Sequence, residues 1–328
     1  MTIESISADE LLKLDIPNVE YLVDGIVPKS GIVYCFGPPG SFKTNFLLYL
    51  SMMGALGQNV FEFKVKEKFR TLWLDEENRK IGMKDKVMKL KNGIKIENGD
   101  LANINILISE GFNILNKVSL DNLEFFIKKH NPNLVVIDSI AKVFPLSERN
   151  EGDVRKIYTF LKPFITKYGV TFIIIHHARK KNFMQFSRDM EDISGSREFA
   201  AMADSIILLD EMKNGTYMLK QVKNRYSQKV YAENFEVTGD DEVMHLIYTG
   251  KVKDKYLAKA LEVRYAIENW SKDNKIERFK RKDIIEAMKT EGFKESNIDA
   301  ALRILKSSGC CGDSFGEYFI KSDEKQER

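Results

Sequence analysis

The sequence predicts an α/β protein with a mostly parallel β-sheet covered by helices on both faces, followed by a small α+β domain. Short apolar runs alternate with amphipathic segments up to about residue 175, which is typical of parallel strands joined by crossover helices. The composition changes near residue 250. We therefore expect a lead-in over residues 1–30, a large α/β domain over 31–250, a linker over 251–255 and a winged helix over 256–328.

Composition excludes several classes of protein. The chain has 328 residues, 43% of them hydrophobic and 30% charged, which describes a globular protein with a sizeable core. A net charge of +3 makes no general case for nucleic acid or membrane, so any basic site must be local. Three cysteines form no disulfide framework, and we see no signal peptide or membrane span. These features predict a cytoplasmic protein without a membrane partner.

The first apolar run leads into a loop rich in glycine and proline. The segment GIVYCFGPPGSFKTNFLLYL, residues 31–50, predicts a strand, a phosphate-binding loop and a helix. In such loops a lysine reaches the β- and γ-phosphates and a hydroxyl holds Mg²⁺, which are the positions of Lys43 and Thr44. The expected cofactors are ATP and Mg²⁺. The expected nucleotide contacts are Gly37, Pro38, Pro39, Gly40, Ser41, Phe42, Lys43 and Thr44.

The loop departs from the usual G-x-x-x-x-G-K-[ST] pattern at Phe42, where glycine is expected. A bulky residue fits there only if its backbone is helical and its side chain turns away from the phosphates. The alternative is an ordinary Gly/Pro turn between a strand and a helix.

The following elements are read from their apolar periodicity. A short helix at residues 7–14 precedes the loop strand. Further helices are expected at 79–90, 119–130 and 154–168, and strands at 71–74, 104–109, 133–138 and 170–175. Four strands with hairpin turns follow at 205–209, 217–223, 230–237 and 243–248.

The segment Leu134 to Asp138 is an apolar strand that ends in a carboxylate. At the carboxyl end of a strand adjacent to the loop strand, Asp138 could hold Mg²⁺ through water. The alternative is a strand that simply ends in aspartate.

The C-terminal region contains the parts of a winged helix. Helices are expected at 256–270, 281–290 and 295–308, and a hairpin at 309–320. The basic residues Lys280, Arg281 and Lys282 are candidates for contact with duplex DNA. A winged helix that mediates protein contacts is the alternative.

Taken in order, these segments resemble the RecA-like P-loop ATPases, most closely the RepA-type replicative helicase branch. The resemblance covers roughly residues 18–248. It is carried by EYLVDGIVPKSG before the loop, TLWLDEEN at 71–78, LVVIDS at 134–139, IIIHHARK at 173–180, DISGSREFAAMADSIILL at 192–209 and LKQVKNRYSQK at 219–229.

The resemblance implies roles for further residues. Glu77 would be the catalytic glutamate that polarises the attacking water, with Asp75 and Glu76 as surface neighbours. His177 would sense the γ-phosphate, although a structural histidine pair is an equal alternative. Lys223 and Arg225, which have no obvious partner within their own strand, would reach a neighbour's site. The resemblance therefore implies a homo-oligomer, expected to be a hexamer.

The segment ARKKNFMQFSR, residues 178–188, combines positive charge with aromatic rings. Cations can track a nucleic-acid backbone while rings stack on bases, so we expect it to bind single-stranded DNA. The family also places a DNA loop here, and a solvated connector is the alternative. The candidate contacts are Arg179, Lys180, Lys181, Phe183, Phe186 and Arg188.

The sequence thus favours an ATP-dependent oligomeric DNA helicase or translocase of a replicon. One alternative is a recombination or repair ATPase of the RecA family. Another is a DNA-binding regulator that senses ATP and turns it over slowly, which the residue at position 42 leaves open.

Overall fold

The structure is a computed structural model in which the chain forms two compact units, Met1–Lys251 and Val252–Arg328. It describes residues 5–15, 18–97, 99–108, 110–144, 151–177, 196–213, 215–228, 230 and 233–251 of the first unit. In the second unit it describes 263, 266–267, 270–271, 274, 278–295, 298–299, 301–303, 311–314 and 317–320.

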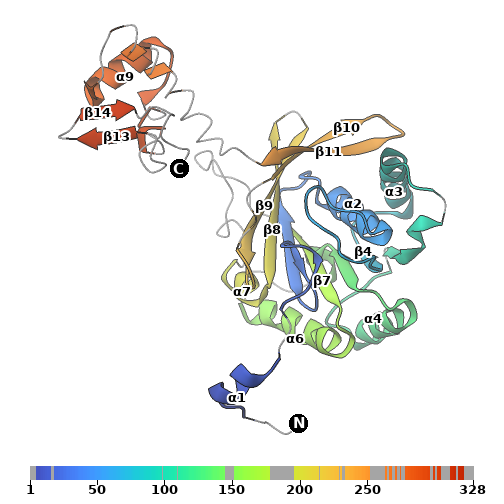
Figure 1. The fold of residues 1–328 in the computed structure, drawn as a ribbon. Coiled ribbons are helices and arrows are strands. Elements are labelled where there is room, and N and C mark those ends of the chain that lie inside the picture. The colour runs from blue at the N-terminus through green and yellow to red at the C-terminus, as the bar shows by residue number, and fades with distance from the viewer. Residues whose placement is uncertain are drawn as a thin grey trace. The chain divides into compact units, whose positions relative to one another are not determined.

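The first unit is built on a 9-stranded sheet in the order β11-β10-β9-β8-β3-β7-β6-β4-β5 (Figure 1). Strands β8, β3, β7, β6, β4 and β5 run parallel, whereas β9, β10 and β11 extend the sheet antiparallel. The strands are β3 (Ile32–Gly37), β4 (Thr71–Asp75), β5 (Ile104–Ile108), β6 (Leu134–Asp138), β7 (Thr171–His177), β8 (Ser205–Lys213), β9 (Thr216–Asn224), β10 (Glu233–Gly239) and β11 (Met244–Lys251). The predicted α/β fold with a mostly parallel sheet is confirmed.

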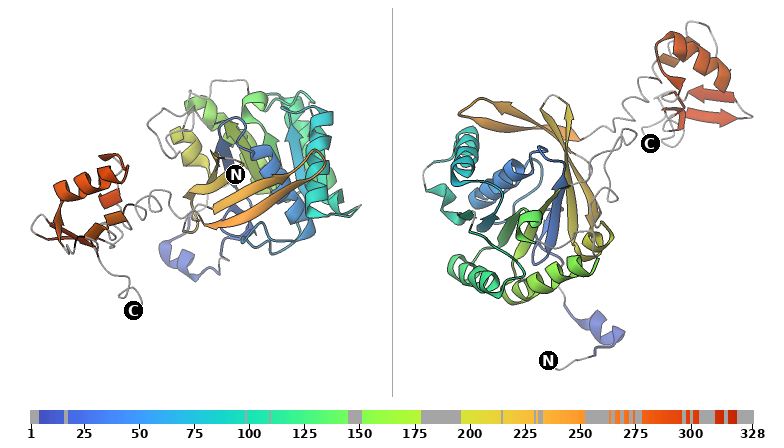
Figure 2. Two further views of the ribbon diagram at one scale, coloured as in Figure 1. Left: turned by 90° about the horizontal axis from the view of Figure 1, so that it is seen from above. Right: turned by 180° about the vertical axis from the view of Figure 1, so that it is seen from behind.

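Helices cover both faces of this sheet, as the views from two further sides show (Figure 2). Helices α2 and α3 lie on one face, with the β10–β11 hairpin alongside them, and α4 and α6 lie on the other. The helices are α1 (Ala8–Lys13), α2 (Lys43–Leu56), α3 (Lys80–Ile94), α4 (Lys117–His130), α5 (Ile140–Val143), α6 (Glu151–Tyr168) and α7 (Ser196–Met202). A 3₁₀ turn (Asp100–Asn103) and a small β1–β2 pair (Tyr21–Val23, Val27–Pro28) complete the unit.

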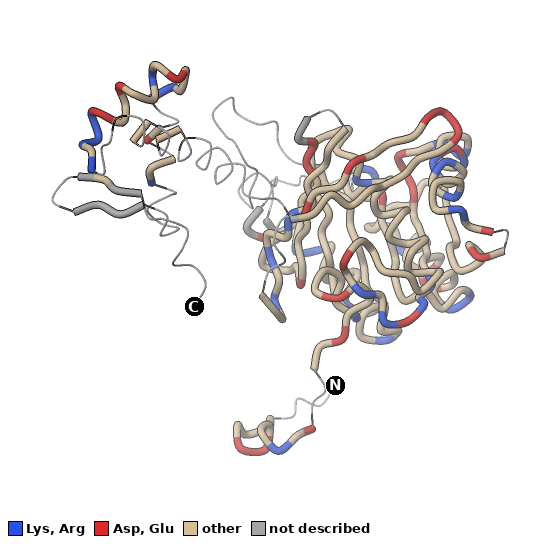
Figure 3. The backbone as a smooth tube through the Cα atoms, turned by 45° about the horizontal axis from the view of Figure 1, so that its top comes forward, with Lys and Arg blue, Asp and Glu red and all other residues tan. Residues whose placement is uncertain are grey.

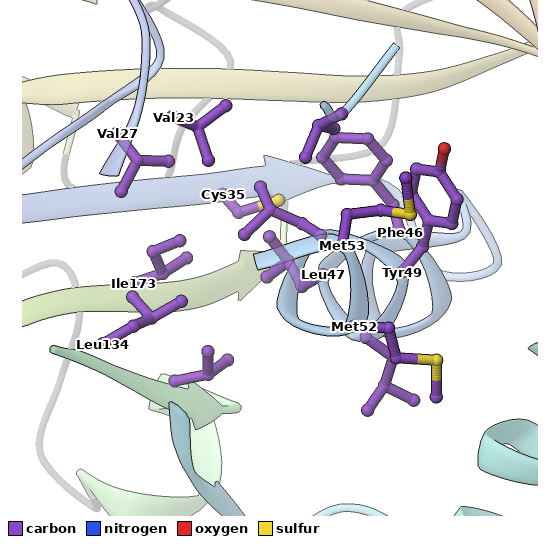
Figure 4. Close-up of a cluster of buried hydrophobic side chains, with 14 of the residues drawn as sticks. Val23, Val27, Cys35, Phe46, Leu47, Tyr49, Met52, Met53, Leu134 and Ile173 are labelled. Carbon is purple, nitrogen blue, oxygen red and sulfur yellow. The ribbon is translucent and has the colours of Figure 1, made fainter. Parts of the chain in front are cut away.

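The two faces divide the core because successive side chains of a strand point to opposite sides. In β3, Val33 and Cys35 belong to the cluster under α2, whereas Ile32, Tyr34 and Phe36 belong to the cluster under α4 and α6. Figure 4 shows the first cluster, in which α2 packs over the strands. A strand buried on both faces reads as a continuous apolar run, which is why the sequence signal was strong.

The second unit has its own small core around buried Ile284, Met288, Ile298 and Phe279. Its described elements are α9 (Arg281–Thr290) and a 3-stranded sheet ordered β12-β14-β13, with bounds Phe279–Lys280, Glu317–Ile320 and Cys311–Ser314. The predicted helix at 281–290 and the C-terminal hairpin are confirmed. The full winged helix stays a prediction, since much of the unit lies outside the described residues.

Charge is distributed without a dominant sign on the first unit, where Figure 3 shows basic and acidic residues interspersed. Among the described residues, no helix is both long and apolar enough to cross a membrane.

Candidate nucleotide-binding site

A pocket of about 270 Å³ lies where the carboxyl ends of β6 and β7 meet the start of α2. It collects predicted site residues from four separate segments of the sequence. It also includes Asn45, Asn78, Lys86 and Ile175, which the sequence did not single out. The lining residues are Pro39, Gly40, Phe42, Lys43, Thr44, Asn45, Glu77, Asn78, Lys86, Asp138, Ile175 and His177.

The loop before α2 follows a tight path that depends on its glycines. A Cβ on Gly37 would lie 2.1 Å from the carbonyl oxygen of Leu209 in β8, so only glycine fits this approach. Gly40 has a φ of +80°, in the left-handed region that favours glycine. The loop is therefore anchored on β8 at its start and turned sharply before the helix.

Lys43 occupies the centre of this loop. Its side chain is buried, and Nζ donates to the carbonyl oxygens of Gly37 at 3.0 Å and Pro38 at 2.7 Å. An ammonium held by neutral carbonyls can exchange them for phosphate oxygens, which carry charge and accept stronger hydrogen bonds. Lys43 thus lies where a bound phosphate would meet it.

The backbone of Phe42 differs from the expected helical conformation. It is left-handed, with φ 69° and ψ 13°, and Phe42 is the N-cap of α2. Its ring packs against Tyr217 of β9, with centroids 5.0 Å apart. The side chain therefore packs against β9, although Phe42 also lines the pocket, and the backbone lies in the left-handed region that favours glycine.

Thr44 and Asp138 meet across the pocket, with the Thr44 hydroxyl donating to Asp138 Oδ2 at 2.7 Å. Burial raises the pKa of Asp138 to about 7; the Thr44 hydrogen bond opposes this, and the charges of Asp75 and Glu77 add to it. The other oxygen, Oδ1, is buried and has no hydrogen-bond partner among the described residues. A hydroxyl beside an unsatisfied buried carboxylate oxygen suits Mg²⁺, which prefers oxygen ligands.

The position of β6 corrects one expectation. We expected Asp138 on a strand adjacent to the loop strand, but β7 lies between β3 and β6. The contact with Thr44 forms nevertheless, because the carboxyl ends of parallel strands meet at one edge of the sheet.

The acidic turn after β4 is more ordered than the expected surface turn. Asp75 is fully buried, and its Oδ1 accepts the backbone N–H groups of Glu77 at 2.9 Å and Asn78 at 2.8 Å. The Asn78 amide also donates to both Asp75 oxygens. The expectation that Asp75 is a surface acid is wrong, because it fixes the turn that presents Glu77.

Glu76 has a second structural role in the same turn. Its carboxylate accepts the backbone N–H groups of Glu110 at 3.1 Å, Gly111 at 3.2 Å and Phe112 at 2.9 Å. Glu76 therefore connects the turn to the segment that follows β5, which also departs from the surface role expected of it.

Glu77 faces His177 at the mouth of the pocket, with Oε2 3.7 Å from Nε2. His177, then Ser139 and Lys43, lower the pKa of Glu77 to about 2, although partial burial opposes them. The group is therefore ionised at neutral pH. The carboxylate can orient and polarise a water molecule, which is the role predicted for it.

The two histidines at the end of β7 lie in different surroundings. His177 is half-buried and lines the pocket, whereas His176 is fully buried with its ring 4.7 Å from that of Phe199. Successive residues of a strand point to opposite faces, so only His177 is placed to respond to a nucleotide.

Lys223 and Arg225 do not reach the pocket of their own chain. Arg225 pairs with Asp204 at 3.0 Å and donates to the Ala201 carbonyl at 2.7 Å, and Asp204 accepts the backbone N–H of Ile32. Ile32 is the first residue of β3, and the phosphate loop begins after Gly37, the last residue of that strand. At the usual rise per residue of a strand, the two ends of β3 are roughly 17 Å apart, so the Arg225–Asp204 pair lies far from the loop.

Lys223 is likewise held within the chain. Its Nζ donates to the carbonyl oxygens of Ala200 and Ala203, at the end of α7. The C-terminus of a helix suits a cation because its last carbonyl groups lack partners within the helix and carry partial negative charge. Both cations thus have partners, outside their own strand. Their action on a neighbour's site stays a prediction.

The candidate DNA contacts are only partly described. Residues 178–188 lie outside the described residues, so Arg179, Lys180, Lys181, Phe183, Phe186 and Arg188 stay predictions. In the second unit Lys280 and Lys282 are exposed at the start of α9. Arg281 instead pairs with Asp299 through two hydrogen bonds of 2.9 and 2.6 Å.

Comparison with known proteins assigns the family. Residues 2–182, more than half of the chain, match the family described as AAA domain. The chain belongs to the AAA domain family. The matched AAA domain includes the phosphate loop, Glu77, Asp138 and His177.

The chain is also similar to two named proteins. It is 25% identical over 227 residues to the DNA repair protein RadA of Halalkalibacterium halodurans, a match that covers 67% of this chain and 42% of that protein. It is also similar to the crystal structure of the RadB recombinase, with a TM-score of 0.48 and 15% sequence identity. That match covers 66% of this chain and 90% of the RadB chain. The AAA domain match and the RadA similarity support the predicted RecA-like P-loop ATPase.

Proposed function

We propose that this AAA domain protein binds ATP with Mg²⁺ in the described pocket and hydrolyses it, as an oligomeric ATPase that acts on DNA in recombination or repair. The observation that carries the proposal is the convergence of Lys43, Thr44, Glu77 and Asp138 on one pocket. These groups supply a cation, a hydroxyl and two carboxylates, which are the parts that phosphoryl transfer to water requires.

Each residue has a distinct role in this proposal. Lys43 neutralises charge on the phosphates, and the N–H groups at the start of α2 donate to them. Glu77 orients the attacking water, and its low pKa keeps it ionised while it does so. Thr44 and Asp138 would hold Mg²⁺, which supplies charge stabilisation when it is bound.

Similarity to a named DNA repair protein supports repair over replication. The basic and aromatic composition of residues 178–188 supports contact with single-stranded DNA. The replicative helicase expected from the sequence is the second candidate, because its motifs appear in order along the same chain.

ATP hydrolysis with and without single-stranded DNA tests the proposal. We expect DNA to stimulate turnover, and Lys43→Ala to abolish it. Replacing Arg179, Lys180 and Lys181 with alanine should remove the stimulation but leave hydrolysis without DNA near normal. Slow turnover that DNA does not change would contradict the proposal and favour an ATP-sensing regulator.

A second measurement separates the two DNA-dependent candidates. A repair or recombination ATPase should pair or exchange homologous strands without unwinding a forked duplex. ATP-dependent unwinding of the fork would instead establish the helicase.

A further inference from the structure

The phosphate loop contains a residue whose conformation its own side chain should disfavour. The backbone of Phe42 lies in the left-handed region at φ 69°. For a residue other than glycine this conformation costs roughly 1–2 kcal/mol, because Cβ comes too close to the following carbonyl oxygen. A conformation of this kind persists only where the surrounding structure holds it.

Aromatic rings from two strands surround the Phe42 side chain. Its centroid lies 5.0 Å from that of Tyr217 in β9 and 6.4 Å from that of Phe235 in β10. Tyr217 and Phe235 stack on each other at 5.6 Å, and Phe46 of α2 stacks on Phe235 at 5.7 Å. Aromatic pairs contribute about 0.5–1.5 kcal/mol each beyond burial, so the two ring contacts of Phe42 together are comparable with the backbone cost.

These contacts also fix the start of α2. The carbonyl of Phe42 accepts the N–H of Phe46 at 2.9 Å, so Phe42 opens the first turn of the helix. Lys43, Thr44 and Asn45, whose N–H groups have no partner within the first turn of a helix, line the pocket that would hold the phosphates. The loop is thus anchored twice on the same side of the sheet, by Gly37 against β8 and by Phe42 against β9 and β10.

We infer that Phe42 is a positioning residue: its ring contacts with Tyr217 and Phe235 hold the phosphate loop in its nucleotide-binding conformation. Where the usual glycine adopts this conformation unaided, the loop of this chain depends on strands β9 and β10. The inference concerns the nucleotide pocket and rests on that part of the proposed function.

A double-mutant cycle between Phe42→Gly and Tyr217→Leu tests the inference. Two readouts apply: amide hydrogen exchange of Gly37 and residues 40–44 in the nucleotide-free protein, since Pro38 and Pro39 have no amide hydrogen, and affinity for a fluorescent ADP. In the natural background Tyr217→Leu should speed loop exchange and weaken ADP binding, each by about tenfold. In the Phe42→Gly background it should change either by less than about twofold, because glycine needs no ring to stay left-handed.

Tyr49→Leu is the matched control. Tyr49 stacks on Phe61 at 5.4 Å on the same face of the sheet, but in the described structure it has no direct ring contact with Phe42, from which it is separated by the rings of Phe61 and Phe235. It should therefore leave loop exchange unchanged in the nucleotide-free protein.

Two results would overturn the inference. One is a Tyr217→Leu effect of equal size in both backgrounds, and the other is no effect in the natural background. Exchange in the nucleotide-free protein depends on neither hydrolysis nor DNA. Intact coupling together with absent turnover would therefore contradict the proposed function and leave this inference standing.

Discussion

At the scale of single residues, the acidic turn assigns different tasks to adjacent carboxylates. Asp75 and Glu76 accept backbone N–H groups and build the turn, whereas Glu77 faces the pocket. The chemistry of the turn should therefore be separable from its stability by substitutions one residue apart.

We predict that Glu77→Gln retains nucleotide binding but lowers hydrolysis by about 10² to 10⁴-fold, because the amide cannot polarise water as a carboxylate does. Binding of fluorescent ATP and steady-state turnover measure the two effects. Glu97→Gln, at an exposed position after α3, is the control and should hydrolyse normally. Normal turnover by Glu77→Gln would show that another residue of the turn has the catalytic role.

We predict that Glu76→Ala lowers the free energy of unfolding by about 1–3 kcal/mol, because three backbone N–H groups lose their acceptor. Urea denaturation measures the loss. Glu76→Gln keeps one acceptor oxygen and should recover part of it, and Glu97→Ala should cost little. Equal stability of all three variants would mean that solvent replaces the Glu76 carboxylate without penalty.

The sequence predicted the residues that line the pocket better than the hydrogen bonds that hold those residues in place. Lys43 and Thr44 follow a local pattern, and Asp138 ends a visible strand. The partners of Glu76 lie more than thirty residues away at Glu110 to Phe112, and no local pattern records that pairing. Lys86 was also missed. It lines the pocket from the second turn of α3, and no local pattern distinguishes it from the other lysines of that helix.

At the scale of elements, the end of β9 is fastened to the end of α7. Arg225 pairs with Asp204, which also accepts the Tyr226 hydroxyl at 2.8 Å and the N–H of Ile32. This cluster joins three elements at the start of the loop strand, so the cation has a structural task whatever else it does.

We predict that Arg225→Ala destabilises the protein by about 0.5–2 kcal/mol, since Asp204 loses a partner in a half-exposed ion pair. Thermal unfolding at low protein concentration measures the loss without contributions from assembly. Arg225→Lys should retain most of the stability because it keeps the charge. If Arg225→Ala unfolds like the natural protein, the contact with Asp204 is energetically negligible.

Arg225→Lys also permits a test of action between subunits. We predict that Arg225→Lys and Lys43→Ala each have impaired ATPase activity alone and that mixing the two variants restores part of it. In some hybrid interfaces the Arg225→Lys subunit supplies an intact phosphate loop, and the Lys43→Ala subunit supplies an intact arginine. Sedimentation checks assembly in the same samples. A fully active monomer would contradict shared sites.

Strand order shows what sequence patterns omit at this scale. Apolar runs predicted the strands of the sheet and the helix at 281–290, because burial imposes a period on the residues themselves. They did not predict that β7 lies between β3 and β6, since neighbours in a parallel sheet are chosen by the path of the crossover helices.

At the scale of the whole molecule, the chain divides into units with separate cores. The first is centred on the 9-stranded sheet, and the second on a cluster that includes Ile284 and Met288. All the residues of the candidate nucleotide pocket belong to the first unit. Nucleotide chemistry should therefore not require the second.

We predict that a chain ending at Lys251 remains folded and hydrolyses ATP near the full-length rate without DNA, because it loses no residue of the pocket. The truncation should weaken duplex binding only modestly. All three residues of the predicted trio are exposed, but Arg281 is paired with Asp299, so Lys280 and Lys282 are the two whose side chains have no acidic partner among the described residues. With about 0.9 per neutralised phosphate, truncation should reduce the slope of log affinity against log salt by about 2. An unchanged slope would indicate that the second unit makes protein contacts instead, and a loss of basal hydrolysis would show that the two units act as one.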